Sequence, residues 1–282
     1  MDDFRALVRA GAVAPAIALE WARYGAASSD RNVVRAAVAL AEFEGDTVMS
    51  GAAAPRFATF VRESFAPRAR ALGFAPKPGE GDDDQLMRRT LLRFAAPYDP
   101  QLLVEARRRA VAWIADRTAE DPGMVDVVLI TAARAGDPSL FDAMLAAAKA
   151  TQDRTERRYL MMALFSFIDP ALATRGLDLL LDPAFDVRET WTALYDAYRW
   201  NPTRRATYDY LVANFDALSK TVDRDAPGRW PVFAAGLCSA KEWAEVEAFW
   251  KPRVATYSGA GRPLASTLEA IELCARLRDA AS

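Results

Sequence analysis

The chain has 282 residues, of which 52% are hydrophobic, with 36 basic and 38 acidic residues and a formal net charge of −2. This composition can supply a large core, and the balanced charge creates no overall field that would attract nucleic acid or an anionic membrane. Histidine is absent. This absence excludes ordinary zinc-hydrolase sites and Ser-His or Cys-His nucleophile pairs, because histidine supplies the ligand or the base in each of them.

The N-terminus, the lack of a long apolar stretch and the two cysteines together indicate a soluble, cytoplasmic protein. Met1-Asp2-Asp3-Phe4 is acidic and lacks the basic and apolar regions of a secretory signal. The longest nearly unbroken apolar stretch, 159–168, is too short to span a bilayer. Cys238 and Cys274 do not make a disulfide framework and have apolar neighbours, so a reduced compartment is the simpler interpretation. The many Arg and Ala residues are typical of a GC-rich, bacterial genome.

Helix signals follow one another from the start of the chain, and there is no convincing strand and no Gly-rich phosphate loop. In chain order we expect helices at 4–10, 15–24, 32–44, 55–72, 85–95, 100–118 and 122–135. The Gly- and Pro-rich stretch 73–84 is the longest candidate linker. It ends in Asp82-Asp83-Asp84, the most obvious acidic cluster of the chain. Because an apolar helix follows at once, we interpret this cluster as a solvated loop with helix-start charge rather than as a catalytic or Mg²⁺ site.

The central part of the chain repeats itself. Asp137-Pro138, Asp169-Pro170 and Asn201-Pro202 are spaced 32 residues apart. Each pair reads as a helix start, because the Asx side chain can cap free backbone N–H groups and proline fixes φ at the first helical position. Apolar residues at three- and four-residue spacing follow each pair, and another helical segment precedes it, at 125–135, 156–168 and 187–200.

Two helices joined by a short turn and repeated about every 32 residues are typical of an α-solenoid. The alternative is that three Asx-Pro pairs fell at equal spacing by chance, but the helices agree as well as the prolines. We therefore expect an all-α fold, a superhelix of antiparallel helix pairs like those of HEAT or armadillo repeats, with no sheet. The expected organisation is one domain at 1–282, with a repeat core at about 124–218 and a C-terminal cap at about 230–282 that contains helices at 230–237, 240–257 and 263–278.

Five segments in order carry a resemblance to a known family. They are the start Asp3-Phe4-Arg5-Ala6-Leu7 with Ala10-Gly11, LGFAPKPGEGDDDQLMRRTLL at 72–92, NPTRRATYDYLVANFDAL at 201–218, GLCSAKEWAEVEAFW at 236–250 and GRPLASTLEAIELC at 261–274. With them the chain resembles, over essentially its whole length, the C-terminal helical domain of the aminopeptidase N family of zinc metallopeptidases. This family includes the puromycin-sensitive and endoplasmic-reticulum aminopeptidases.

The resemblance implies an accessory domain that closes over the active site of a catalytic metallopeptidase domain in the parent chain and shapes the access of peptide substrates. The family's zinc-binding H-E-x-x-H helix, its downstream Glu ligand and its G-x-M-E-N strand are absent from this sequence. We therefore expect no catalytic residue, no metal ligand and no cofactor in this chain, and zinc only in the catalytic domain. The alternatives are a free-standing α-solenoid that binds peptides or proteins, and a histidine-free carboxylate enzyme, which would need a convergent pair of buried carboxylates.

Peptide-contact candidates are the basic and aromatic residues on the periodic helices, because arginine can bind a carboxylate bidentately and aromatic rings can pack against side chains. The candidates are Arg157, Arg158, Trp191, Tyr195, Arg199, Arg204, Arg205 and Tyr208. The competing interpretation is that the arginines are solvated charges and Trp191 is core packing. In two-helix solenoids the second helix of each unit commonly lines the concave wall, so Arg205 and Tyr208, three residues apart, are expected to share a face toward the substrate.

Overall fold

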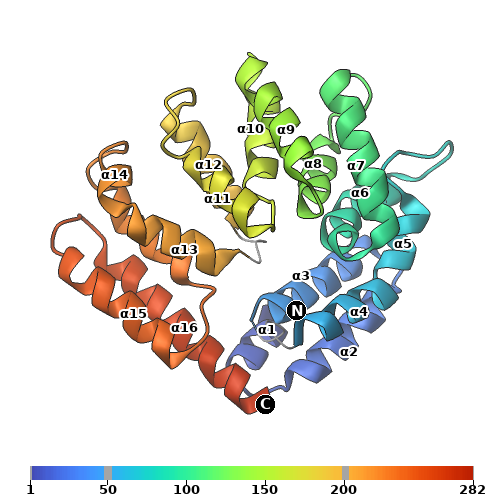
Figure 1. Cartoon of the computed structure of the whole chain (residues 1–282). Coiled ribbons are helices and arrows are strands. Elements are labelled where there is room, and N and C mark those ends of the chain that lie inside the picture. The colour runs from blue at the N-terminus through green and yellow to red at the C-terminus, as the bar shows by residue number, and fades with distance from the viewer. Residues whose placement is uncertain (1, 48–52, 199–202, 282) are drawn as a thin grey trace. The chain divides into compact units, whose positions relative to one another are not determined.

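The computed structural model describes residues 2–47, 53–198 and 203–281 of the chain (Figure 1). All regular elements within these ranges are helices, so the predicted all-α class is confirmed. The chain divides into two compact units, Met1–Leu164 (unit 1) and Phe165–Ser282 (unit 2). This boundary lies inside the predicted repeat core, and each unit is therefore described by itself.

Unit 1 is a succession of helices joined by short connections. They are α1 (Asp2–Arg9), α2 (Pro15–Ala26), α3 (Arg31–Thr47), α4 (Ala54–Ser64), α5 (Ala66–Leu72), α6 (Asp82–Ala95), the 3₁₀ turn η2 (Ala96–Tyr98), α7 (Pro100–Ala115), α8 (Val125–Arg134), α9 (Pro138–Ala150) and α10 (Arg154–Leu164). Neighbours in sequence pack against each other: α2 against α3, α7 against α8, and α9 against α10. The single helix predicted at 55–72 is two helices, because Pro67 cannot continue α4 without losing a backbone hydrogen bond and clashing with the preceding turn.

The core of unit 1 is centred on aromatic rings from α4, from Phe65 between α4 and α5, from α6 and from η2. Phe65 and Phe94 meet edge to face with centroids 4.9 Å apart, and Phe57 meets Tyr98 in the same way at 5.8 Å. Phe65 is fully buried, and Phe94 is 5% exposed. Burial of these rings is the main favourable term for this part of the fold, at roughly 25 cal/mol per Å² of apolar surface.

The predicted helix starts are confirmed where the structure describes them. Asp137 accepts a hydrogen bond from the Leu140 N–H at 2.9 Å, and α9 begins at Pro138. Asp169 likewise accepts from the backbone at the start of α11 (Pro170–Asp178). The third pair, Asn201-Pro202, lies outside the described residues.

Arginine side chains join helices of unit 1 that are not neighbours in sequence. Arg89 on α6 donates to both oxygens of Asp126 on α8, with an Nη1–Oδ1 distance of 2.6 Å. Arg107 on α7 donates at 2.6 Å to Asp137, the N-cap of α9. Genome composition alone therefore does not explain the arginines: several of them join helices that are far apart in sequence.

Unit 2 contains a second set of helices. They are α11, α12 (Val187–Tyr198), α13 (Arg204–Ala213), α14 (Phe215–Ser219), the 3₁₀ helix η3 (Ala226–Ala234), α15 (Ala240–Trp250), the 3₁₀ turn η4 (Lys251–Arg253) and α16 (Gly261–Ala281). The helix predicted at 230–237 is the 3₁₀ helix η3, because Pro227 and Pro231 remove the N–H groups that an α-helix would need. Trp230 of η3, which is 1% exposed, is the centre of the core.

The two cysteines correct one expectation from the sequence. Cys238, just after η3, and Cys274, on α16, form a disulfide with their Cα atoms 5.0 Å apart. The expectation of two reduced cysteines is therefore wrong; their spacing of 36 residues gave no sign that the fold brings them together. Disulfides persist mainly in oxidising compartments, so the cysteines no longer support a cytoplasmic location.

Candidate functional site

The aromatic candidates on α12 belong to the core of unit 2. Trp191 is 7% exposed and stacks on Trp230, with ring centroids 4.6 Å apart and planes 11° from parallel. Tyr195 is half-buried and lies against Phe233 at 4.7 Å. Burial raises the pKa of Tyr195 to about 12, because the phenolate would lose solvation there. The main role of these two side chains is therefore packing in the core, and they offer a ligand little surface.

The α13 candidates have different environments. Tyr208 is 3% exposed, and burial raises its pKa to about 12. Arg204 is half-buried and lies against Gly236, where a Cβ would overlap its guanidinium. Arg205 is exposed. Arg205 and Tyr208 therefore do not share an exposed face, although they are three residues apart.

The Arg205 guanidinium is surrounded by carboxylates. Its Nε donates to Asp209 at 2.9 Å, and its Nη1 donates to Glu245 at 2.8 Å and lies 3.6 Å from Glu242. The hydrogen bond to Asp209 is the largest cause of a pKa above the usual arginine value. The arrangement joins α13 to α15, and a substrate carboxylate would have to compete with three protein carboxylates for the same cation.

The remaining candidates, Arg157, Arg158 and Arg199, do not add to the α12 and α13 candidates of unit 2. Arg157 and Arg158 are on α10 in unit 1, where the Arg157 Nη2 donates to the Thr151 carbonyl at 2.7 Å and Arg158 is exposed. Arg199 lies outside the described residues. Unit 2 thus brings together the α12 and α13 candidates in and around one aromatic core, whereas Arg157 and Arg158 belong to unit 1.

The acidic cluster has the role that the sequence predicted. Asp82, Asp83 and Asp84 form the first turn of α6, where negative charge is favourable next to the unpaired backbone N–H groups. Asp83 also pairs with Arg31 at 3.0 Å. Across the described ranges, no group of three or more acidic or cysteine side chains is arranged to hold a metal ion.

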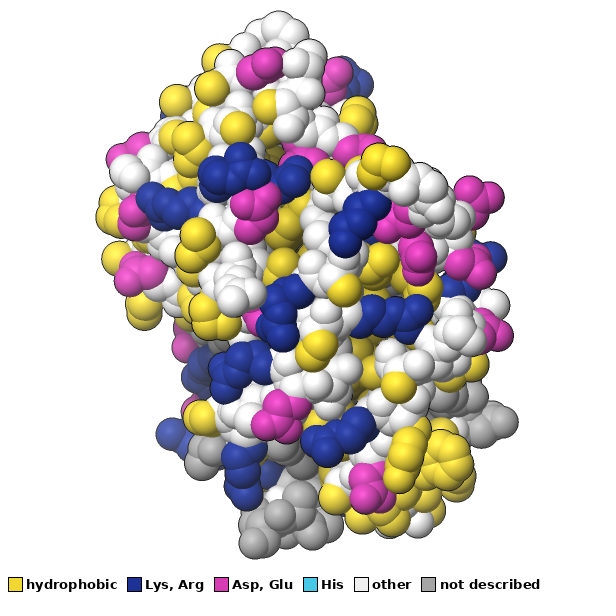
Figure 2. Space-filling model, turned by 90° about the vertical axis from the view of Figure 1, so that its right-hand side faces the viewer, with side chains coloured by type: hydrophobic (Ala, Val, Ile, Leu, Met, Phe, Trp, Pro, Cys, Tyr) yellow, Lys and Arg dark blue, Asp and Glu magenta, His cyan; other side chains and the backbone are white. Residues whose placement is uncertain are grey.

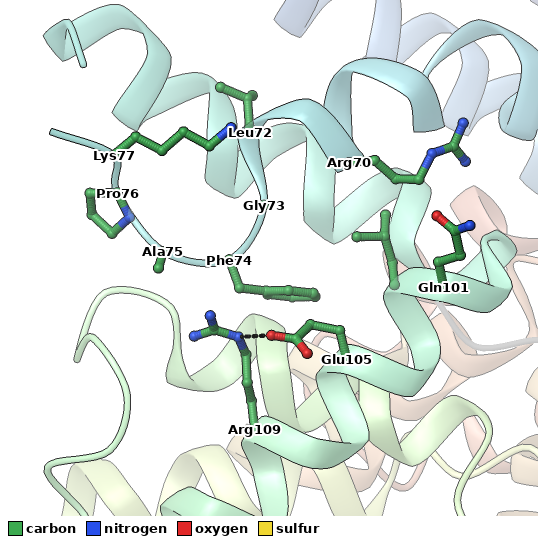
Figure 3. A pocket seen from close by; sticks show the side chains of 11 residues that line it. Arg70, Leu72, Gly73, Phe74, Ala75, Pro76, Lys77, Gln101, Glu105 and Arg109 are labelled. Atoms are coloured by element: carbon green, nitrogen blue, oxygen red, sulfur yellow. Dashed lines mark hydrogen bonds and ion pairs between the residues drawn. The ribbon is translucent and has the colours of Figure 1, made fainter. Parts of the chain in front are cut away.

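A pocket that the sequence did not predict lies between the segment 73–77 and the helices α5 and α7 (Figure 3). Its volume is about 430 Å³, within the range of small-ligand sites. It is lined by Arg70, Leu72, Gly73, Phe74, Ala75, Pro76, Lys77, Gln101, Leu102, Glu105 and Arg109. The Gly- and Pro-rich composition of 73–81 was its only signal in the sequence, and that composition is typical of linkers in general.

A buried ion pair gives the pocket its shape. Arg88 on α6 donates to the Glu80 carboxylate through Nη1 at 2.8 Å and also through Nη2, and these two side chains are 2% and 6% exposed. The same guanidinium donates through Nε to the Gly73 carbonyl at 3.0 Å. Gly73 has a φ of 64°, a conformation that glycine adopts without strain and that ends α5. Both ends of the segment 73–80 are therefore fixed to α6.

One end of unit 1 exposes large apolar side chains. We define the N-terminal apolar patch as Leu7 on α1 and Ile17, Trp21 and Tyr24 on α2, which are 46%, 45%, 57% and 76% exposed. The three α2 residues are spaced i, i+4 and i+7, so they lie on one face of the helix, and the Trp21 ring lies 6.2 Å from Phe4. Exposed apolar groups that share one helix face mark interaction surfaces more often than single exposed residues do.

One face of the molecule shows charges of both signs (Figure 2). On the face drawn in Figure 2, basic side chains are spread among acidic ones, and hydrophobic side chains gather near its lower right edge. Within the described part of the chain, none of the helices combines the length and the apolar character needed to cross a bilayer.

Comparison with protein-family models places this geometry in context. The model of the ERAP1-like C-terminal domain matches residues 1–273. The match includes all of unit 1, with the pocket and the N-terminal apolar patch, and unit 2 as far as residue 273.

Proposed function

Because the chain belongs to the family of ERAP1-like C-terminal domains, we propose that it is the accessory domain of a zinc aminopeptidase. In this proposal it docks on the catalytic domain of the parent chain, closes over the active site and shapes the access of peptide substrates. The chain performs no catalysis by itself, and the zinc is held by the catalytic domain. The family match carries the proposal.

The N-terminal apolar patch supports a docking role. Trp21 and Tyr24 expose more than half of their side-chain surface, and burying such rings against a partner is favourable at roughly 25 cal/mol per Å². Aromatic residues are also enriched at the energetic centres of protein interfaces. We therefore assign the patch to the contact with the catalytic domain.

Peptide contact by candidates on the periodic helices remains part of the proposal. Of the eight candidates, Arg158 in unit 1 and Arg205 in unit 2 are exposed, and Arg157, Tyr195 and Arg204 are half-buried. Trp191 and Tyr208 are buried in unit 2, so in the proposal they pack beneath its exposed side chains and do not touch the peptide.

Co-purification tests the docking directly. A tagged catalytic domain, expressed from the reading frame upstream of Met1, should retain this chain on an affinity column. Changing Trp21→Glu and Tyr24→Glu together should reduce the retained amount at least tenfold, because the patch would then bury charge. The matched control is Val104→Glu with Val111→Glu, two residues of α7 that are 72% and 53% exposed.

Two outcomes would contradict the proposal. If the upstream frame encodes no H-E-x-x-H catalytic domain, the chain is a free-standing helical module. If both double variants are retained as well as the unchanged chain, the patch is not the docking surface.

A further inference from the structure

Helix α7 has a regular row of exposed side chains. Its buried face, which packs into unit 1, consists of Leu102, Ala106, Ala110 and Trp113. On the opposite side lies an exposed row that we call the α7 seam: Gln101, Val104, Arg108, Val111 and Ala115. The steps of three, four, three and four residues are those of the a and d positions of a coiled coil. Such a row runs along one side of the helix and suits one further helix.

The two valines of the seam have little to pack against in the chain itself. Val104 is 72% exposed and Val111 is 53% exposed. A β-branched side chain loses χ1 freedom in a helix, so valine is a poorer helix former than arginine, glutamine or glutamate. An exposed position offers no packing that would offset this cost. Burying both valines against a second helix would remove their apolar surface from water, which is favourable.

Charges of both signs lie along the seam and are balanced within the chain. Arg108 donates to Glu105, which lies at the edge of the seam, through Nε at 2.9 Å and Nη2 at 2.7 Å. Arg109 also donates to Glu105, at 2.7 Å, and is paired in turn with Glu120 at 2.8 Å. The seam therefore presents a cation and an anion about one helical turn apart, with no excess of either sign.

This arrangement of charges is complementary to itself. A second copy of α7 that runs antiparallel brings its Arg108 beside Glu105 of the first copy. The twofold symmetry then brings its Glu105 beside Arg108 of the first copy, so both contacts join opposite charges. In a parallel pair the two Arg108 side chains would lie at the same level and repel each other. A partner surface with charge of a single sign would match only one of the two groups.

We propose that the chain self-associates through the α7 seam, with two copies of α7 packed antiparallel about a twofold axis. Val104 of each copy then packs against the aliphatic stem of Arg108 of the other copy, and Val111 packs against Gln101. The seam is about 21 Å long at 1.5 Å per residue. Its contact is smaller than a standard interface, and the dimer is therefore weak. The seam shares no residue with the N-terminal apolar patch, so self-association is independent of the docking proposed above.

Sedimentation equilibrium of the chain at concentrations up to about 500 µM tests this proposal, because small interfaces give weak dimers. The apparent mass should rise with concentration toward twice the 30.9 kDa of one chain. Val104→Glu with Val111→Glu should weaken the association at least tenfold, because each copy would then bury charge. Trp21→Glu with Tyr24→Glu, which adds the same charges to the N-terminal apolar patch, is the matched control and should leave the association unchanged.

An exchange of charges tests whether the partner is an antiparallel second copy. Arg108→Glu leaves two acidic groups at positions 105 and 108, and Glu105→Arg leaves two basic ones, so neither variant alone should associate as the unchanged chain does. A mixture of the two variants, each shown to be folded by circular dichroism, should associate again, because each copy then meets the opposite charge.

The proposal is wrong if the unchanged chain stays monomeric at about 500 µM, a concentration at which a weak interface should be populated. It is also wrong if the Val104 and Val111 double variant associates as the unchanged chain does, or if the mixture of the two charge variants stays monomeric. Loss of association in the Trp21 and Tyr24 double variant alone would overturn it as well, because the N-terminal apolar patch would then be the surface of self-association.

Discussion

Glu44 is a buried carboxyl group without a hydrogen-bond partner. It lies near the end of α3, its side chain has no exposed surface, and neither oxygen has a partner. Burial raises its pKa from 4.5 to about 7, because the ionised form loses its hydration. The protonated form is thus the one that the folded chain accommodates.

This shift predicts a pH dependence of stability. The folded state holds a proton on Glu44 that the unfolded state releases, so the free energy of unfolding should fall as the pH rises from about 4.5 to about 7. A shift of this size corresponds to about 3 kcal/mol. Glu44→Gln should remove that part of the pH dependence, as measured by urea denaturation at several pH values. An unchanged difference between pH 5 and pH 7 in the variant would show that other groups cause it.

Arg88 should be among the least replaceable side chains of unit 1. Arg88→Met leaves the Glu80 carboxylate buried without its cation, and breaking such a pair costs about 3–5 kcal/mol. Replacing both residues, with Glu80→Gln added, should recover part of this loss, since no buried charge then remains. Denaturation gives the stabilities, and limited proteolysis at 73–81 reports whether the segment is released. Equal stability of Arg88→Met and the unchanged chain would contradict the assignment.

At the scale of elements, the disulfide attaches α16 to the connection between η3 and α15. It closes a loop of 36 residues, and the entropy model assigns such a cross-link about 4 kcal/mol. Cys238→Ser with Cys274→Ser should therefore lower the midpoint of thermal unfolding, and a reductant should do the same to the unchanged chain but not to the variant. A reductant that left the unchanged chain's midpoint unaffected would argue against the bond.

The contact between α13 and α15 leads to a prediction for Arg205. Its side chain is 46% exposed, so losing its ion pairs should cost about 1 kcal/mol or less. Because its guanidinium is held by protein carboxylates, Arg205→Ala in the full-length enzyme should change the hydrolysis of long peptides and of short aminoacyl reporters to the same small extent. A selective loss for long peptides, about fivefold in kcat/KM for one charge-assisted contact, would instead identify Arg205 as a substrate contact.

Tyr208 shows what helical spacing in a sequence can and cannot predict about a side chain. Its spacing with Leu211 and Phe215 put it on the apolar face of its helix, and it is buried there. The expectation that Tyr208 contacts substrate relied on its three-residue spacing from Arg205 and ignored this apolar periodicity. Helical spacing identifies which residues share a face, but exposure depends on what packs there, and for Tyr208 that includes Trp250 from a distant helix.

At the scale of the whole molecule, the sequence predicted features that depend on neighbouring residues and missed contacts between residues that are far apart in the chain. The Asp137 and Asp169 caps follow from neighbouring residues, as does the acidic first turn of α6. The Cys238–Cys274 bond and the Arg88–Glu80 pair depend on the tertiary fold, which periodicity does not describe. The pocket likewise forms where segment 73–77 folds back on α7, and no spacing along the chain encodes that approach.

The central claim is that this chain docks through α1 and α2 on a catalytic aminopeptidase domain. Hydrogen–deuterium exchange of the full-length protein and of this chain alone tests it most directly. We predict that backbone amides of α2 near Trp21 and Tyr24 exchange more slowly in the full-length protein, whereas those of α7 near Val104 and Val111 exchange equally in both. Equal exchange of α2 in the two proteins would contradict the claim.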